Sequence, residues 1–416
     1  MAQGYDTEEQ KERVLLVGVQ LDNQEDMESS LEELKALAKT AGAETVGKVI
    51  QPRDAYHPAT YIGKGKLEEV RSLIEETGAT GIICDDELSP AQLRNLEDAL
   101  GTKVMDRTMV ILDIFASRAT TSEGKIQVEV AQLKYRSTRL TGLGTTLSRL
   151  GGGIGTRGPG EKKLETDRRI IRDRISRLSK DLEEIKNHRE VARQNRSRTA
   201  VPVAAIVGYT NAGKSTLLNY MTDAGILSED KLFATLDPTT RAMNLPNGEK
   251  ILLTDTVGFI RKLPHNLIEA FKSTLEEAKY ADIIVHVVDA SSPDRDIQMD
   301  VVYKTLKELE VGDKPVVTLF NKCDKFENAD TEAPVLRDFK ADETAYISAR
   351  TGRGIADFEA ILEKIIRVHL VQTFAYADAG KIQQIRAQGQ LIKEEYTENG
   401  IEVEAYVPKA LYQKLQ

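Results

Sequence analysis

The stretch GYTNAGKS, residues 208–215, decides the fold class of this 416-residue chain. It has the form G-x-x-x-x-G-K-[ST] and follows an apolar run, residues 203–207, that is typical of a buried strand. A helical pattern begins at Lys214. A glycine-rich turn between a strand and a helix aims backbone N–H groups and the positive helix end at phosphate oxygens. The stretch therefore predicts a phosphate-binding loop in an α/β domain.

Two side chains of this loop have predicted chemical roles. The Lys214 ammonium is expected to reach the β and γ phosphates of a nucleotide, and the Ser215 hydroxyl is expected to bind Mg²⁺. A loop of this form does not by itself distinguish ATP from GTP. The choice of base has to come from other parts of the chain.

The motif DTVG, residues 255–258, follows another strand-like run at residues 251–253. A carboxylate at a strand end near the phosphate loop suits a magnesium site, and the Gly258 N–H can meet the γ phosphate. This is the Walker-B position of a P-loop enzyme. A simple turn at a strand end is the alternative interpretation of the motif.

The motifs NKCD, residues 321–324, and SAR, residues 348–350, each follow a further strand-like run. The Asp324 carboxylate only accepts hydrogen bonds, which suits the paired N–H donors on N1 and N2 of guanine. The N–H of Ala349 suits guanine O6. A surface turn or a helix cap would explain each motif alone. Four motifs in this order, each at the end of a strand, predict a GTPase.

The segment LFATLDPTTR, residues 232–241, lies between the first two motifs and is a threonine-rich loop where a switch segment belongs. A mobile loop that binds the metal only beside the γ phosphate couples nucleotide state to shape. Thr235 is the candidate for the second protein ligand of Mg²⁺. Thr239 and Thr240 are alternatives, and spacing alone does not separate the three.

These motifs, with FATLD at residues 233–237 and the glycine-rich GGGIGTRGPGEKKLE at residues 151–165, resemble the HflX-type GTPases of the translation-factor-related class. The resemblance covers nearly the whole length. It favours Thr235 as the magnesium ligand, because the threonine of FATLD has that role in the family. It also implies hydrolysis of GTP to GDP and phosphate, association with the large ribosomal subunit and its RNA, and splitting or rescue of stalled ribosomes.

The predicted site residues fall into four groups. Three are expected to take part in catalysis: Lys214, Thr235 and Gly258. Two are expected to bind Mg²⁺: Ser215 and Thr235. Four are expected to contact RNA: Arg149, Arg157, Lys162 and Lys163. The residues expected to bind GTP are Gly208, Tyr209, Thr210, Asn211, Ala212, Gly213, Lys214, Ser215, Phe233, Ala234, Thr235, Leu236, Asp237, Asp255, Thr256, Val257, Gly258, Asn321, Lys322, Cys323, Asp324, Ser348, Ala349 and Arg350.

Phe259 follows DTVG at the position where Ras-like proteins carry a glutamine that orients the attacking water. A phenyl ring cannot hydrogen-bond water, so we expect slow intrinsic hydrolysis. A partner, a backbone group or a monovalent cation such as K⁺ near the Asn211 carbonyl would supply the missing function. The alternative role for Asn211 is that of a turn former that tolerates unusual backbone angles.

The length of the chain predicts roughly two to four domains, and its alternating strand-like and helical patterns predict an α/β multidomain protein. No apolar run approaches the roughly 20 residues that span a bilayer, and the first residues are polar and acidic, so we expect a cytoplasmic protein without stable membrane insertion. We also expect a monomer. The two cysteines lie far apart in sequence and support neither a disulfide framework nor a metal site.

The expected domains are a small parallel α/β domain (1–106), an antiparallel helical hairpin (107–200), a P-loop GTPase domain (201–370) and a small α+β domain (371–416).

The charge of the chain is unevenly distributed. Residues 134–198 hold 18 Lys and Arg against 8 Asp and Glu, a surplus of +10, which leaves −19 for the rest of a chain whose net charge is −9. Two long helical patterns, at residues 107–140 and 161–198, flank a loop at residues 142–160 with eight glycines. We expect a hairpin whose tip contacts structured RNA through charge and shape. A solvated basic coil is the alternative.

Alternating strand-like and helical runs fill the N-terminal region, and the motif YIGKGK, residues 61–66, precedes one of the helices. The motif is either a helix start or a second phosphate site, and its incomplete pattern favours the helix start.

Two other functions stay open: a regulatory switch that binds a protein through its coiled coil, and an ATP-driven RNA-remodelling enzyme centred on the N-terminal domain. A helix at residues 351–370 and an Asn-Gly hairpin near residue 399 are expected towards the C-terminus.

Overall fold

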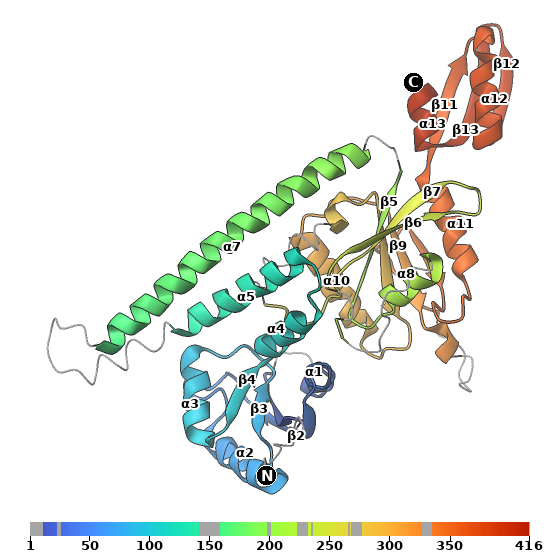
Figure 1. Ribbon diagram of the computed structural model, residues 1–416. Coiled ribbons are helices and arrows are strands. Elements are labelled where there is room, and N and C mark those ends of the chain that lie inside the picture. Colours follow the sequence, from blue (N-terminus) through green and yellow to red (C-terminus); the bar gives the residue numbers. More distant parts are fainter. Residues whose placement is uncertain are drawn as a thin grey trace, which may run out of the picture. The chain divides into compact units, whose positions relative to one another are not determined.

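The computed structural model describes residues 11–22, 26–140, 159–197, 201–222, 232–233, 236–264, 267, 277–326 and 335–415 (Figure 1). It is a mixed α/β protein, as predicted. The chain forms two compact units, and each is described by itself. The first contains Met1–Ile185, Glu229–Asp237 and Ile260–Lys272, and the second contains Lys186–Ser228, Pro238–Phe259 and Ser273–Gln416. The division into four domains stays a prediction.

The N-terminal sheet is parallel throughout, which confirms the predicted α/β arrangement. Its order is β2-β1-β3-β4, so the chain reverses its winding direction between β1 and β3. The fourth strand was not predicted, because the four residues KVMD are too short to show a pattern. The strands are β1 (Arg13–Gln20), β2 (Glu44–Pro52), β3 (Gly81–Cys84) and β4 (Lys103–Asp106).

Helices α1 (Met27–Thr40), α2 (Lys64–Thr77) and α3 (Pro90–Leu100) connect these strands, and side chains cap the starts of α1 and α3. The Asp26 carboxylate accepts a hydrogen bond from the Glu28 N–H at the start of α1. Ser89 forms a reciprocal capping box with Gln92 at the start of α3. Local sequence therefore determines where α1 and α3 begin.

Helices α4 (Arg107–Arg118) and α5 (Ser122–Leu140) are separate, with residues 119–121 between them. The sequence suggested one long helix with an interruption near this point. Helix α7 (Pro159–Ser197) follows, and Figure 1 shows its first part lying along α5. The Arg174 guanidinium of α7 binds the Glu129 carboxylate of α5 at 2.8 Å, and Leu178 is buried. The glycine-rich residues 142–158 lie outside the described residues.

The second unit contains a six-stranded sheet of order β10-β9-β8-β5-β7-β6, in which only β6 is antiparallel to its neighbour. Three of the four nucleotide motifs directly follow or overlap the carboxyl ends of β5, β7 and β9, and SAR begins two residues after β10. The elements are β5 (Val203–Gly208), α8 (Lys214–Thr222), β6 (Thr239–Asn244), β7 (Lys250–Asp255), β8 (Ile283–Asp289), α10 (Arg295–Glu308), β9 (Val316–Asn321), β10 (Glu343–Tyr346) and α11 (Ile355–Ile366).

The C-terminal residues form the three-stranded antiparallel sheet β11-β13-β12 with two helices. The predicted helix at residues 351–370 was wrong at its end, because α11 stops at Ile366 and a strand begins at the next residue. Leu370 and Phe374 point into the core of this sheet while Val371 is exposed, a strand alternation that the apolar run concealed. The elements are β11 (Arg367–Phe374), α12 (Ala379–Gln388), β12 (Gln390–Thr397), β13 (Gly400–Pro408) and α13 (Lys409–Leu415).

The expected hairpin between β12 and β13 is present, with Thr397 paired to Gly400 across the turn. Gly400 has φ +138°, and a Cβ there would lie 2.4 Å from the Phe374 carbonyl oxygen. Among the described residues, no helix is both long and apolar enough to cross a membrane.

Candidate functional site: a phosphate loop with a guanine pocket

The phosphate loop runs from the end of β5 into α8, and two glycines allow its tight path. Gly208 has φ +152°, and a Cβ there would lie 2.2 Å from the Val287 carbonyl oxygen. Gly213 has φ +99°, and a Cβ there would lie 2.2 Å from the side-chain nitrogen of Asn321. Any larger residue at either position would displace the loop. The predicted cradle for phosphates is therefore preformed.

Lys214 lies inside this loop and is only 6% exposed. Its ammonium donates hydrogen bonds to the carbonyl oxygens of Gly208, at 3.1 Å, and Tyr209, at 2.8 Å. Burial lowers the pKa of Lys214 to about 8, against the opposing effect of the Asp255 carboxylate, and Lys322 lowers it further. A phosphate group in the loop would favour the charged ammonium. The lysine is therefore held where an anionic ligand would stabilise its proton.

Ser215 and Asp255 bring two oxygen groups together beside the loop. The Ser215 hydroxyl donates to the Asp255 carboxylate at 2.8 Å, and Asp255 is fully buried at the end of β7. Hydroxyl and carboxylate oxygens are the donor type that Mg²⁺ prefers. These two residues fit a magnesium ion of the kind that bridges nucleotide phosphates.

The DTVG segment is joined to the phosphate loop by its backbone. The Thr210 N–H donates to the Phe259 carbonyl at 2.8 Å, and the Phe259 N–H donates to the Gly208 carbonyl at 3.1 Å. A Cβ at Gly258 would lie 2.9 Å from Thr210 Cα and 3.0 Å from Lys214 Nζ. The ring of Phe259 is buried, so this side chain offers nothing to orient a water molecule.

Asn321 connects the phosphate loop to the SAR segment. Its side-chain amide donates to the Ala212 carbonyl at 2.8 Å, and its side-chain oxygen accepts from the Ala349 N–H at 2.9 Å. The Ala349 N–H, which the sequence placed on guanine O6, is therefore engaged by Asn321 in this structure. The asparagine of NKCD has a scaffolding role that the motif alone did not reveal.

Asp324 carries the carboxylate predicted to read guanine. It accepts a hydrogen bond from the Ser348 hydroxyl at 2.7 Å and forms an ion pair of 3.2 Å with Arg350, which is largely exposed. Lys322 has φ +67° and donates to the Asn211 carbonyl at 2.8 Å. Because Lys322 occupies that carbonyl, the described structure gives no support for a monovalent cation there. Asn211 has φ +60°, as expected of a turn former.

The residues around FATLD belong to the first unit. The Phe233 ring packs edge-on against Phe115 of α4, with ring centroids 4.7 Å apart. Asp237 accepts four hydrogen bonds from Thr120 and Thr121, at the junction of α4 and α5. Ala234 and Thr235 lie outside the described residues. The alternatives Thr239 and Thr240 lie in β6, where the Thr240 hydroxyl is hydrogen-bonded to that of Thr254.

The residues after DTVGF are also held within the first unit. The Lys262 ammonium binds the carboxylates of Asp85, at 2.5 Å, and Asp86, at 2.7 Å, just beyond β3. Arg261 is 3% exposed and donates to the Ser29 hydroxyl at 3.0 Å. These contacts join residues more than 170 positions apart in the chain, so no local pattern predicted them.

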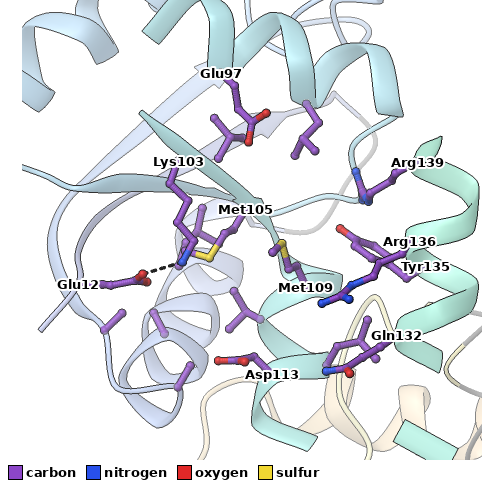
Figure 2. Close-up of a pocket in the computed structure, with 18 residues that line it drawn as sticks. Glu12, Glu97, Lys103, Met105, Met109, Asp113, Gln132, Tyr135, Arg136 and Arg139 are labelled. Carbon is purple, nitrogen blue, oxygen red and sulfur yellow. Dashed lines mark hydrogen bonds and ion pairs between the residues drawn. The ribbon is translucent and has the colours of Figure 1, made fainter. Parts of the chain in front are cut away.

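A cavity of about 340 Å³ lies among α3, β4, α4 and α5 (Figure 2). Its walls are largely apolar and include Met105 and Met109, while its rim carries charges of both signs, with Lys103 and Glu12 paired at 2.6 Å. None of the predicted site residues lines it. The cavity is therefore separate from the nucleotide motifs.

Two other predicted sites have different outcomes. YIGKGK leads into α2, which begins at Lys64, and the Gly63 N–H donates to the side-chain oxygen of Gln51, so the expected helix start is present and the second phosphate site stays a prediction. The predicted RNA contacts Arg149 and Arg157 lie outside the described residues. Lys162 and Lys163 belong to α7, and their side chains also lie outside the described part.

Three protein-family models match the chain. They are described as the N-terminal region of a GTP-binding GTPase (residues 28–116), the middle region of the same GTPase (residues 118–196) and a 50S ribosome-binding GTPase (residues 203–322). Together they cover most of the chain. The third model spans the phosphate loop, the DTVG segment and the first two residues of NKCD.

Curated relatives match along the whole chain. The GTPase HflX of Lacrimispora saccharolytica is 64% identical over 100% of this chain and 98% of its own length. The GTPase HflX of Escherichia coli is 43% identical over 87% of this chain and 84% of its own length. A crystal structure of a GTP-binding protein from Sulfolobus solfataricus with GDP covers 86% of this chain and 98% of that chain, at 25% identity and a TM-score of 0.44. On the family models and curated relatives, this chain belongs to the HflX family of GTPases and hydrolyses GTP.

Proposed function

We propose that this GTPase binds the large ribosomal subunit and promotes the splitting or rescue of stalled ribosomes. The observation that carries the proposal is the match of residues 203–322 to the family described as 50S ribosome-binding GTPases. The basic residues 134–198 supply a surface of the right charge. Ribosomal RNA is a dense polyanion, so a surplus of ten positive charges favours its binding.

Helix α7 and the last residues of α5 are the parts of this basic segment that the structure describes. Arg169, Arg172 and Arg177 are exposed along it, whereas Leu178 faces inward. The helix begins directly after the glycine-rich residues 142–158, which carry Arg149 and Arg157. We propose that this basic tip, with Lys162 and Lys163, contacts ribosomal RNA through phosphates and shape rather than base sequence.

In the proposed reaction, the chain binds GTP and orients it for hydrolysis. Lys214 neutralises the β and γ phosphates, the Gly258 N–H meets the γ phosphate, and Asp324 pairs with guanine. Ser215 and Thr235 would hold Mg²⁺, which supplies charge neutralisation between the phosphates when bound. Since Phe259 cannot orient water, we propose that the ribosome accelerates hydrolysis by ordering the residues around FATLD and DTVG.

Co-sedimentation with purified large subunits tests the binding. The chain should pellet with the subunit in a nonhydrolysable GTP analogue and much less in GDP. Splitting is tested by adding the chain and GTP to intact ribosomes and following separated subunits on a sucrose gradient. Equal absence of the chain from both pellets would contradict the proposal.

A charge variant tests the tip. Changing Arg149 and Arg157 to serine should weaken binding and flatten its dependence on salt by up to about two counterions. Intrinsic hydrolysis without ribosomes should not change. Lys304 and Lys307, exposed on α10, provide a control pair when changed to serine. A tip variant that binds like this control would remove the tip from the proposal.

A further inference from the structure

Thr210 lies inside the phosphate loop, and its hydroxyl takes no part in holding the loop together. The residue is 6% exposed, and its Oγ1 atom is buried without a hydrogen-bond partner among the described residues. Most buried polar groups in proteins are hydrogen-bonded, and the exceptions are often found where a group acts on a ligand. The unpaired hydroxyl of Thr210 therefore indicates a partner that arrives with the nucleotide.

The neighbours of Thr210 place its side chain beside the groups that bind phosphate. A Cβ added to Gly258 would lie 2.9 Å from the Cα and Cγ2 atoms of Thr210 and 3.0 Å from the Lys214 ammonium. Thr210 and Lys214 thus border the same point of the DTVG segment. The lysine of a phosphate loop reaches the β and γ phosphates of the nucleotide. The γ phosphate is therefore expected next to Thr210.

Backbone hydrogen bonds hold Thr210 in this place. Its N–H donates to the Phe259 carbonyl at 2.8 Å, and the Phe259 N–H donates to the Gly208 carbonyl at 3.1 Å. All these residues belong to the second unit. The Thr210 methyl group faces Gly258, and the hydroxyl is the other branch of the same Cβ. Rotation about the Cα–Cβ bond between staggered positions turns the hydroxyl towards Gly258 without any change in the backbone.

The chemistry of hydrolysis gives this hydroxyl a task that its neighbours do not perform. The attacking water needs an acceptor for one of its hydrogens. The Phe259 ring has no such group, and the Lys214 ammonium only donates hydrogen bonds. A threonine hydroxyl donates one hydrogen bond and accepts two. Thr210 can therefore accept from the water while it donates to an oxygen of the γ phosphate.

We propose that Thr210 is a catalytic residue whose hydroxyl orients the attacking water during GTP hydrolysis. The water oxygen bonds to the γ phosphorus, the bond from that phosphorus to the β–γ bridging oxygen breaks, and GDP leaves with the electron pair. One proton of the water passes to a γ-phosphate oxygen and the other stays on the attacking oxygen, which gives dihydrogen phosphate. The Thr210 hydroxyl keeps its own proton. The inference rests on the proposed placement of the γ phosphate beside Lys214 and Gly258.

Single-turnover hydrolysis of GTP by the full chain, without ribosomes, tests this role. Thr210→Val removes the hydroxyl and keeps the shape of the side chain. It should lower the hydrolysis rate by about 10- to 100-fold, the effect of a misplaced reacting group. Thr210→Ser keeps a hydroxyl and should recover most of the rate. Affinities for GDP and for a nonhydrolysable GTP analogue should change little, because a group that acts in the transition state alters the rate rather than ground-state binding.

Thr305→Val is the matched control. Thr305 is 9% exposed, and its hydroxyl donates to the Val301 carbonyl within α10 at 2.8 Å. Thr210→Val and Thr305→Val each remove one hydroxyl from a buried threonine of the second unit. If Thr210→Val does not bind GDP, Thr210→Ala removes the hydroxyl without adding bulk, and the same comparison is made with it.

A slow Thr210→Val with parental nucleotide affinities, and recovery of the rate in Thr210→Ser, establishes the role. The inference is overturned if Thr210→Val hydrolyses GTP like Thr305→Val, or if Thr210→Ser is as slow as Thr210→Val. It is also overturned if the variants without the hydroxyl lose affinity for GDP and for the analogue, because Thr210 would then only shape the loop. These assays contain no ribosomes, so failure of the parent chain to sediment with large subunits contradicts only the ribosomal proposal.

Discussion

The phosphate loop differs from the FATLD segment and from the residues after DTVGF in what holds it. The loop is held by residues of its own sheet: Asn321 binds the Ala212 carbonyl, and the Lys214 ammonium binds the loop itself. Asp237 and Lys262, in contrast, bind side chains and backbone groups near α5 and β3 of the first unit. The phosphate loop is thus held within its own sheet, whereas Asp237 and Lys262 are held by residues outside that sheet.

This difference suggests how the protein separates binding from response. A preformed loop binds nucleotide without large rearrangement, so we expect the affinity for GDP, which lacks the γ phosphate, to depend mainly on residues of the second unit. Segments attached to another part of the chain can transmit a change in nucleotide state, because their anchors are discrete ion pairs and hydrogen bonds. Variants in the two regions should therefore have different signatures.

The largest expected effect comes from the guanine pocket. Asp324→Asn should lose GTP and gain xanthosine triphosphate, because an amide can pair with the altered edge of that base. Sites built on such polar pairs discriminate by roughly 10⁴ to 10⁵. Competition between labelled GDP and each triphosphate measures the change. GTP binding equal to that of the parent chain would show that NKCD does not read the base.

Lys214→Ala should have the next largest effect. Removing one partner of a buried charge-assisted contact costs about 2–5 kcal/mol of binding free energy, so GDP and GTP should both be lost at micromolar protein. Titration with a fluorescent GDP measures it. Lys325→Ala is the control, because Lys325 is exposed and binds only the Ser291 hydroxyl among the described contacts. Similar GDP affinities for Lys214→Ala and Lys325→Ala would contradict the role of Lys214 in binding the phosphates.

The same contrast explains how far the sequence could predict this molecule. The nucleotide motifs are local patterns, and the structure places all those it describes on one sheet. The predicted RNA contacts and the magnesium ligand Thr235 stay predictions. The contact between Asp237 and Thr120 joins positions 117 residues apart, and no pattern in either segment indicates the other.

Two errors in secondary structure have a similar origin. Strand β4 has only four residues, and it forms because β3 lies beside it, not because of its own propensity. Strand β11 follows α11 without a break, and its pairing with β13 ends the helix at Ile366. In both places, pairing with another strand overrides the local sequence pattern. This pairing cannot be inferred from a single sequence.

A smaller effect should follow from breaking the ion pairs between Lys262 and the carboxylates of Asp85 and Asp86. Lys262→Met removes an ammonium from fully buried Asp85, although Arg107 and Ser30 still bind that carboxylate. We expect a loss of about 1–3 kcal/mol in the local stability of β3, measured by hydrogen exchange of its amides. GDP affinity should stay parental, since the phosphate loop is independent of this anchor.

Lys66→Met is the matched control for that variant. Lys66 pairs with Glu69 one turn along α2, and such helix-surface pairs contribute about 0.3–0.5 kcal/mol. Equal protection of β3 in the two variants would mean that the Lys262 ion pair contributes no more than a surface pair. A fall in GDP affinity for Lys262→Met would show that the two regions are not independent.

The smallest predicted effect is a pH dependence of the cradle itself. Since burial lowers the pKa of Lys214 to about 8, the nucleotide-free protein loses this proton as the pH rises through 8, whereas bound phosphates favour the ammonium. GDP affinity should therefore fall by roughly sixfold between pH 7 and 8.8, with proton uptake on binding.

The contribution of Lys214 to stability has the opposite sign: the unfolded chain holds the proton up to about pH 10.5, so folding of the free protein is favoured as the pH rises from 8. Calorimetry in buffers of different ionisation enthalpy measures the uptake. Lys214→Arg, which stays charged throughout, controls for ionisation of the nucleotide. If the GDP affinity of the parent protein changed with pH in the same way as that of Lys214→Arg, Lys214 would already be fully protonated in the nucleotide-free protein.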